Sequence, residues 1–208
     1  MPVFEQVNGA AVDYEFDVFV SYRRSAGNVG DWVHHHFYPV LKRCLEDEAG
    51  TGEIFVDRQM EGNIGDSWPD QLADSLGKSR LLVPVLSAPY FRSPWCIAEW
   101  ATMAAREERE RRGRSNALIL PVVFADGVNF PEYVQERELH EGFKNYNVPY
   151  PEYRKSEAYP YFHREVQGFA RQIAGRLTKV PDWREDWPAL RPPADAPVPS
   201  PKPDLGAT

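Results

Sequence analysis

Short apolar segments alternate with amphipathic segments along most of this chain. Residues 81–86 and 117–125 are apolar at nearly every position, which is typical of strands buried on both faces of a parallel sheet. Residues 32–48 and 95–112 place apolar side chains three or four positions apart, which predicts helices packed on that sheet. The alternation predicts an α/β fold, a three-layer sandwich with a central parallel sheet of about five strands.

The other predicted elements fit between these segments. Strands are predicted over residues 14–21, 53–57, 80–86 and 117–124, with a further short strand near 143–146, and helices also over 66–77 and 159–177. Pro84 is unusual here, because proline has no N–H to give to a neighbouring strand, and it should lie where no hydrogen bond is required. Ligands of such sheets bind beyond the carboxyl ends of the strands, so the loops after residues 21, 57 and 86 are the candidate site.

One folded domain accounts for most of the chain. Its 208 residues are 42% hydrophobic, which is enough for a single core. The composition changes near the end, where prolines stand among small and polar residues that have little to bury. We therefore divide the chain into an N-terminal extension at 1–12, a folded domain at 13–180 and a proline-rich disordered tail or linker at 187–208.

Charge and hydropathy disfavour several classes of partner. With 24 basic and 31 acidic side chains the formal net charge is −7, which disfavours binding to nucleic acid. No apolar run approaches the roughly 20 residues that span a membrane, and acidic Glu5 does not fit a secretory signal. Cys44 and Cys96 are too few for a disulfide framework. These features predict a cytoplasmic protein with no nucleic-acid or membrane partner.

Three motifs, in this order, carry a family resemblance: FDVFVSYRR at 16–24, IFVDRQMEGNIGDSWPDQLADSLGKSR at 54–80 and LVPVLSAPYFRSPWCIAEW at 82–100. Together they resemble the TIR (Toll/interleukin-1 receptor) domain, which implies a flavodoxin-like form of the three-layer sandwich. They resemble most of all the bacterial and plant-like branch of this family, many members of which cleave NAD+. The resemblance implies an NAD+ glycohydrolase that gives nicotinamide and ADP-ribose or a cyclic ADP-ribose isomer. NAD+ would then be the substrate, with no cofactor, in bacterial antiphage defence or cell-death signalling.

The resemblance implies a single catalytic residue, Glu99, in the Trp-x-x-x-Glu motif of residues 95–99. Breaking the nicotinamide–ribose bond develops positive charge on the sugar, which a nearby carboxylate stabilises. The alternative is an ordinary first-turn glutamate favoured by the helix dipole. Trp95 either lines the site or seats the helix on the sheet, and Cys96 is expected to pack as a small apolar residue.

The candidate substrate site gathers polar and aromatic residues near the carboxyl ends of the first two strands. Arginine suits a pyrophosphate and an aromatic ring suits a base or nicotinamide. One of Arg23 and Arg24 is therefore expected to bind phosphate, with Phe19 or Tyr22 stacking on a ring. The predicted substrate-binding residues are Phe19, Ser21, Tyr22, Arg23, Arg24, Asp57, Arg58, Ser67, Trp68 and Trp95.

Metal binding and partners complete the sequence-based expectations. The consecutive residues His34, His35 and His36 point in different directions on a helix, so no metal site is predicted. TIR–TIR self-association is expected, with Trp68 as a lid or assembly contact, and a downstream effector would sense the nucleotide product. The alternative function is a non-catalytic TIR scaffold, against which the presence of Glu99 with its tryptophan argues.

Overall fold

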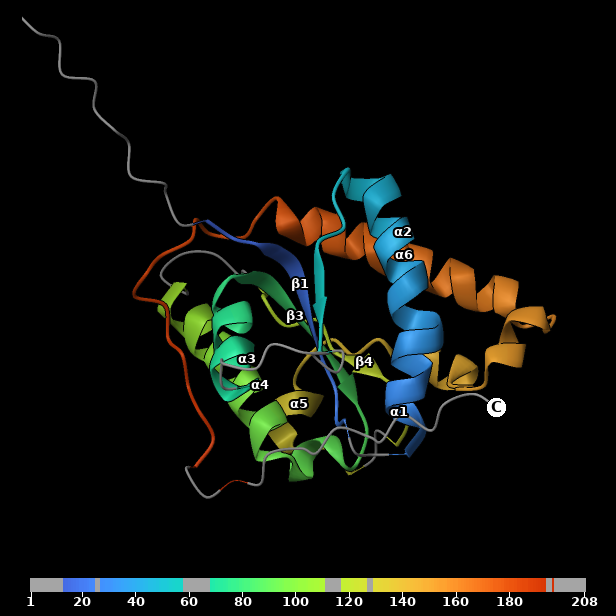
Figure 1. Cartoon of the computed structure of the whole chain (residues 1–208), viewed down its shortest axis with the longest axis horizontal. Helices are drawn as coiled ribbons and strands as arrows, with labels where there is room; N and C mark the ends of the chain where they lie inside the picture. The colour runs from blue at the N-terminus through green and yellow to red at the C-terminus, as the bar shows by residue number, and fades with distance from the viewer. Residues whose placement is uncertain are drawn as a thin grey trace, which may run out of the picture.

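A parallel sheet forms the centre of the molecule, with strand order β2-β1-β3-β4 (Figure 1). The structure, a computed structural model, describes residues 13–24, 27–57, 68–110, 117–126, 129–193 and 196. The strands are β1 (Phe16–Ser21), β2 (Ile54–Val56), β3 (Ser79–Leu86) and β4 (Val122–Val123). β1 and β3 are buried along almost their whole length, as strands covered on both faces must be.

Helices cover both faces of this sheet, with α3 and α4 on one side and α2 and α6 on the other (Figure 1). The helices are α1 (Gly27–Trp32), the π-helical turn η1 (Val33–Phe37), α2 (Tyr38–Ala49), α3 (Trp68–Gly77), α4 (Pro94–Glu110), α5 (Glu132–Gln135) and α6 (Tyr159–Leu177). Three 3-10 segments are η2 (Tyr90–Arg92), η3 (Glu141–Tyr146) and η4 (Pro151–Lys155). The predicted three-layer α/β sandwich is therefore confirmed. The helix predicted over 32–48 starts earlier, at Gly27, and contains the π-helical turn.

The predicted strand near 143–146 is wrong, because these residues belong to the 3-10 segment η3. Phe143 is fully buried in an aromatic cluster, with its ring 6.1 Å from that of Trp32 and 5.5 Å from that of Phe37. Packing of this ring therefore holds the segment against the core in its 3-10 conformation. An extended strand at the edge of the sheet would not place the ring in this cluster. The described residues hold a four-stranded sheet instead of about five strands, and a single bridge from Val122 to His140 occupies its β4 edge.

A proline in the neighbouring strand β3 interrupts the pairing of the strand predicted over 117–124, of which only Val122–Val123 forms a regular strand. The N–H of Leu82 donates to Leu118, and the N–H two residues later along β3 would point to the same side. That residue is Pro84, which has no N–H, so the ladder between β3 and β4 is interrupted there. Regular pairing resumes only at Val85 with Val122. Pro84 thus lies in a central strand but at a gap in its hydrogen bonding.

The segment 181–190, which we call the strap, packs along the layer formed by α3 and α4 (Figure 1). Trp187 is only 8% exposed, and the indole N–H of Trp183 donates to the last residue of α3. The backbone N–H of Leu190 donates to the Thr102 hydroxyl at 2.9 Å. The expectation of a disordered tail from residue 187 onward is therefore wrong for residues 187–190, because the Trp187 ring is buried against the domain and Leu190 is hydrogen-bonded to it. Within the described residues, no helix has the length and apolar character to cross a membrane.

Candidate active site

Glu99 lies in the second turn of α4, where the helix passes the carboxyl end of β1. Its side chain is buried, and the Ser21 hydroxyl at the end of β1 donates a hydrogen bond to Oε2 at 2.5 Å. The pKa of Glu99 is raised to about 8, chiefly by burial and also by the negative charge of Asp57, while the Ser21 hydrogen bond acts to lower it. An exposed first-turn glutamate would have none of these properties, so this alternative is excluded.

Tyr90 extends this contact into a chain of hydrogen bonds. Its hydroxyl lies 2.9 Å from Ser21 Oγ and 3.3 Å from the carbonyl oxygen of Cys96, to which it donates. Tyr90 is fully buried, and its burial raises the pKa of the phenol well above the usual value. The motif of residues 82–100 contains this tyrosine, but no spacing in the sequence indicates that it folds beneath Glu99, and sequence reasoning missed it.

Arg24 and Asp57 form an ion pair beside the carboxylate. Arg24 Nη1 lies 3.1 Å from Asp57 Oδ2, and both side chains are mostly buried. The Tyr22 hydroxyl donates to the Asp57 carbonyl oxygen at 2.8 Å and lies 2.7 Å from His34 Nε2. These contacts fix the loop after β1 to the end of β2. Arg24 is therefore held by a carboxylate.

Arg23 differs from its neighbour. It lines the same pocket as Glu99, it is partly exposed, and within the described part of the chain it has no ion-pair partner. A guanidinium without a carboxylate keeps its donors for an anionic ligand. One of Arg23 and Arg24 was expected to bind phosphate, and Arg23 is the better placed of the two.

Aromatic side chains line the pocket from two sides. Phe19 is 1% exposed, and its ring stacks on Phe55 with centroids 4.9 Å apart, so it forms the floor. Trp95 is partly buried, packs against the core and also lines the pocket, so both interpretations of this residue describe part of its environment. Cys96 is buried, which raises the pKa of its thiol, as expected for a packed residue without nucleophilic character.

The glycine-bearing loop after β2 contributes three predicted residues that the structure does not place. Arg58 and Ser67 lie outside the described residues. Trp68 begins α3, but its side chain also lies outside them. The structure therefore brings seven predicted binding residues to one pocket with Glu99: Phe19, Ser21, Tyr22, Arg23, Arg24, Asp57 and Trp95.

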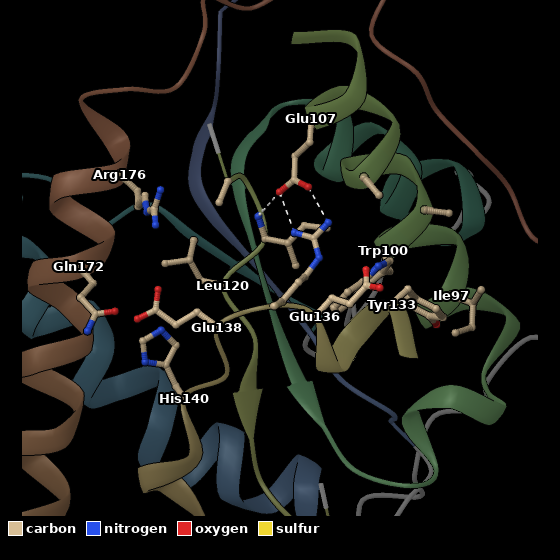
Figure 2. Close-up of a pocket in the computed structure, with 15 residues that line it drawn as sticks. Ile97, Trp100, Glu107, Leu120, Tyr133, Glu136, Glu138, His140, Gln172 and Arg176 are labelled. Carbon is tan, nitrogen blue, oxygen red and sulfur yellow. Dashed lines mark hydrogen bonds and ion pairs between the residues drawn. The ribbon is translucent and has the colours of Figure 1, made fainter. Parts of the chain in front are cut away.

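The pocket beside Glu99 is small. Its free volume is about 20 Å³, which is room for about one water molecule, whereas ligand sites usually enclose roughly 300 Å³ or more. A larger cavity of about 780 Å³ lies elsewhere, between α4, α5 and α6 (Figure 2). There Glu107 accepts hydrogen bonds from Arg137 at 3.0 and 2.6 Å. The two share no lining residue, so the large cavity adds no room beside Glu99.

The three histidines contact different segments. His34 contacts Tyr22, while the rings of His35 and His36 lie 3.0 and 2.9 Å from the carbonyl oxygens of Pro149 and Tyr150. The ring nitrogens of His35 and His36 thus hold the chain that follows η3. Among the described residues, no group of three or more His, Cys, Asp and Glu side chains could hold a metal ion.

The fold and the site define a doubly wound α/β domain with a buried carboxylate at the carboxyl edge of its sheet. A family model of the TIR domain matches residues 18–147. The chain therefore belongs to the TIR domain family, and the family prediction is confirmed.

Solved structures similar to the chain include two groups of TIR domains. The TIR domain of the Toll-related receptor TRR-2 from Hydra magnipapillata is 17% identical, with a TM-score of 0.49, over 75% of this chain and 98% of that one. The TIR domains of the activated Roq1 resistosome, which directly recognises the pathogen effector XopQ, are 20% identical, with a TM-score of 0.37, over 77% and 84%. A search of curated proteins found no match.

Proposed function

We propose that this TIR domain is an NAD+ glycohydrolase in which Glu99 stabilises the ribosyl cation. The observation that carries the proposal is a buried carboxylate with a dedicated hydroxyl donor and an arginine that has no carboxylate partner in the described structure. Nicotinamide is a good leaving group, so one carboxylate suffices without a separate general acid. The Trp-x-x-x-Glu motif that resembles NAD+-cleaving members supports the same function.

The reaction breaks the bond between the ribose C1′ and the nicotinamide nitrogen. The bonding electron pair leaves with the nicotinamide, which becomes neutral, and the positive charge moves to the ribose ring. The ionised carboxylate of Glu99 offsets that charge. Water then adds to C1′ and loses a proton, which gives ADP-ribose, or an adenine nitrogen adds instead, which gives a cyclic isomer.

Substrate binding follows from the charges around the pocket. Arg23 would bind the pyrophosphate, and Trp95 at the pocket wall would contact the nicotinamide ring. Arg24 remains paired with Asp57 and keeps the loop after β1 in place. Because the pocket has room for about one water molecule, the segments around it must move apart before a dinucleotide can enter.

Burial of Glu99 links this opening to catalysis. With a pKa of about 8, the carboxyl is mostly protonated at neutral pH while the pocket is closed. Opening the pocket to water and to the cationic nicotinamide favours the ionised form. The closed domain would therefore be weakly active, which suits an enzyme that would otherwise consume cellular NAD+.

Self-association would supply the opening. We extend the proposal to TIR–TIR contacts formed by the loop after β2, with a downstream effector that senses the product in the cytoplasm during antiphage defence or cell death. Specific activity should then rise with protein concentration, and Trp68→Ala should blunt the rise. Constant specific activity across a hundredfold dilution series, with a destabilised Trp68→Ala, would remove the assembly hypothesis.

Incubation of the purified chain with NAD+ tests the enzyme directly, with released nicotinamide as the readout. The parent should release nicotinamide and Glu99→Gln should not. Glu110→Gln makes the same chemical change at the end of the same helix, in a residue that pairs with Arg184, and should leave activity unchanged. If the parent releases none at high concentration and alkaline pH, the domain is a non-catalytic scaffold.

A further inference from the structure

Three buried groups form a continuous path that ends at the Glu99 carboxylate. Ser21, Tyr90 and Glu99 come from β1, η2 and α4, and each is less than one-tenth exposed. Their successive distances are 2.5 Å from Ser21 Oγ to Glu99 Oε2 and 2.9 Å from Ser21 Oγ to the Tyr90 hydroxyl. The other end of the path is the carbonyl oxygen of Cys96, which lies 3.3 Å from the Tyr90 hydroxyl.

We propose that Ser21 and Tyr90 form a two-hydroxyl relay that positions the Glu99 carboxylate and makes its ionised form easier to reach, a role that rests on the function proposed above. Both are positioning residues, because neither needs to touch the substrate to act. Ser21, which the sequence predicts to bind substrate, instead directs its hydroxyl at Glu99.

When Glu99 is ionised, the relay points toward it. Ser21 donates its proton to Oε2, and Tyr90 donates to Ser21 Oγ. Each donor in such a chain polarises the next, and a hydrogen bond to a charged acceptor is stronger than one between neutral groups. The carboxylate thereby receives a strengthened hydrogen bond at a place where water has little access.

When Glu99 is protonated, the same three groups can point the other way. The carboxyl O–H donates to Ser21, Ser21 donates to the Tyr90 oxygen, and Tyr90 donates to the carbonyl of Cys96. A hydroxyl can rotate between such partners, and the Cys96 carbonyl oxygen accepts the Tyr90 proton in this second state only. No buried hydroxyl is left without a partner in either state, which allows Glu99 to change charge without a rearrangement of the fold.

Among the described residues, the other charged and titratable side chains around Glu99 make no hydrogen bond to the Tyr90 hydroxyl, and their identity is the same in the parent and in variants of Ser21 or Tyr90. Asp57 raises the pKa of the carboxyl and is itself paired with Arg24. Arg23 lines the same pocket from the loop after β1, and the Cys96 thiol remains protonated because burial raises its pKa. A change caused by replacing Ser21 or Tyr90 is therefore attributable to the relay.

The pH profile of NAD+ cleavage tests the relay, since catalysis requires the ionised carboxylate. Ser21→Ala should shift the midpoint upward by about one pH unit or more, because it removes a hydrogen bond to a charged group. At pH values below the midpoint, such a shift lowers the kcat of Ser21→Ala about tenfold, and kcat recovers at alkaline pH. Tyr90→Phe should shift the midpoint in the same direction by roughly a third of that, and Ser21→Thr, which keeps the hydroxyl, should restore the parental midpoint.

An infrared titration separates failure of the relay from failure of the proposed function. The carbonyl band of the protonated Glu99 carboxyl, identified by its absence in Glu99→Gln, is followed against pH in the parent, Ser21→Ala and Tyr90→Phe. It reports ionisation whether or not NAD+ is cleaved. Equal midpoints in parent and variants would overturn the relay, even if activity falls uniformly. Should Tyr90→Phe fail to fold, the pair Ser21→Ala and Ser21→Thr decides the question alone.

Discussion

Helix α4 carries two buried ionisable residues, Glu99 and Arg106, whose surroundings differ. They are seven positions apart, or about two turns, and so lie on the same side of the helix. Glu99 is 8% exposed and Arg106 is 2% exposed. Each reaches a different end of the sheet, Glu99 the end of β1 and Arg106 the start of β3.

The carboxylate has specific polar partners, whereas the guanidinium has few. Arg106 Nη1 donates to the Ser79 carbonyl at a long 3.4 Å, and its Nε and Nη2 have no hydrogen-bond partner among the described residues. The Trp187 ring of the strap lies 5.8 Å from the guanidinium carbon. Burial lowers the pKa of Arg106 to about 10.

The number of polar partners distinguishes a buried charge that serves function from one that does not. At the Glu99 end, two hydroxyls satisfy the group in either protonation state, as expected where a change of charge belongs to the function. At the Arg106 end, an aromatic ring and one carbonyl cover a charge that stabilises little. We therefore expect the first site to govern activity and the second to affect only stability.

The largest expected effect is on activity. Glu99→Gln should lower NAD+ cleavage by about a hundredfold or more, because the amide keeps the shape but cannot offset the ribosyl charge. Arg106→Met should keep parental activity. Nicotinamide release is measured at saturating NAD+ for both variants. Near-normal turnover by Glu99→Gln would refute the catalytic assignment, and equal losses in both variants would remove the distinction between the two ends of α4.

The next effect is the pH dependence of stability. The pKa of Glu99 is raised from 4.5 to about 8, so between these values the folded state binds a proton that the unfolded state has released. The parent should lose stability as pH rises through this window. Glu99→Gln has no such group, so the melting temperature of the parent minus that of the variant should fall as pH rises. A constant difference would contradict the raised pKa.

The sequence predicted those parts of the molecule that depend on local pattern. The helix at 159–177 needs only apolar periodicity, and the strand at 80–86 needs only a continuous apolar run; both are present close to the predicted bounds. The pairing of Glu99 with Ser21 was not predicted, because it depends on which strand ends beside α4, and the sequence pattern contains no strand order. Tyr90 could not be assigned, because its role arises from a short 3-10 turn that brings its hydroxyl back to Ser21.

The strap was missed for a different physical reason. Prolines remove backbone donors and indicate an extended, unpacked segment, which is the usual consequence of such composition. Trp187 outweighs that tendency here, because burial of one large aromatic side chain contributes about 1.5–3 kcal/mol. This tryptophan at the start of the proline-rich segment is the signal that could have indicated contact with the domain.

Removal of the strap should cost stability but not activity. A chain ending at Val180 loses the burial of Trp187 and the bonds from Leu190 to Thr102. We expect a loss of about 1–3 kcal/mol in the free energy of unfolding, partly offset because Arg106 regains water. A chain ending at Pro193 keeps the described strap and should match the parent in urea denaturation. Equal stability of both truncated chains would show that the strap contributes nothing.

The smallest expected effect is that of Arg106→Met on stability. Methionine removes a desolvated charge that has no described anionic partner, while it keeps much of the apolar contact with Trp187. Replacing a buried charge by an apolar side chain of similar length is often neutral or stabilising, so the free energy of unfolding should stay within about 1 kcal/mol of the parent or rise. Arg137→Met is the matched comparison, because it leaves the Glu107 carboxylate without its guanidinium and should cost about 1–3 kcal/mol. Urea denaturation of both variants at neutral pH decides the matter: a larger loss for Arg106→Met than for Arg137→Met would mean that Arg106 stabilises the fold, and that both ends of α4 hold their charges equally well.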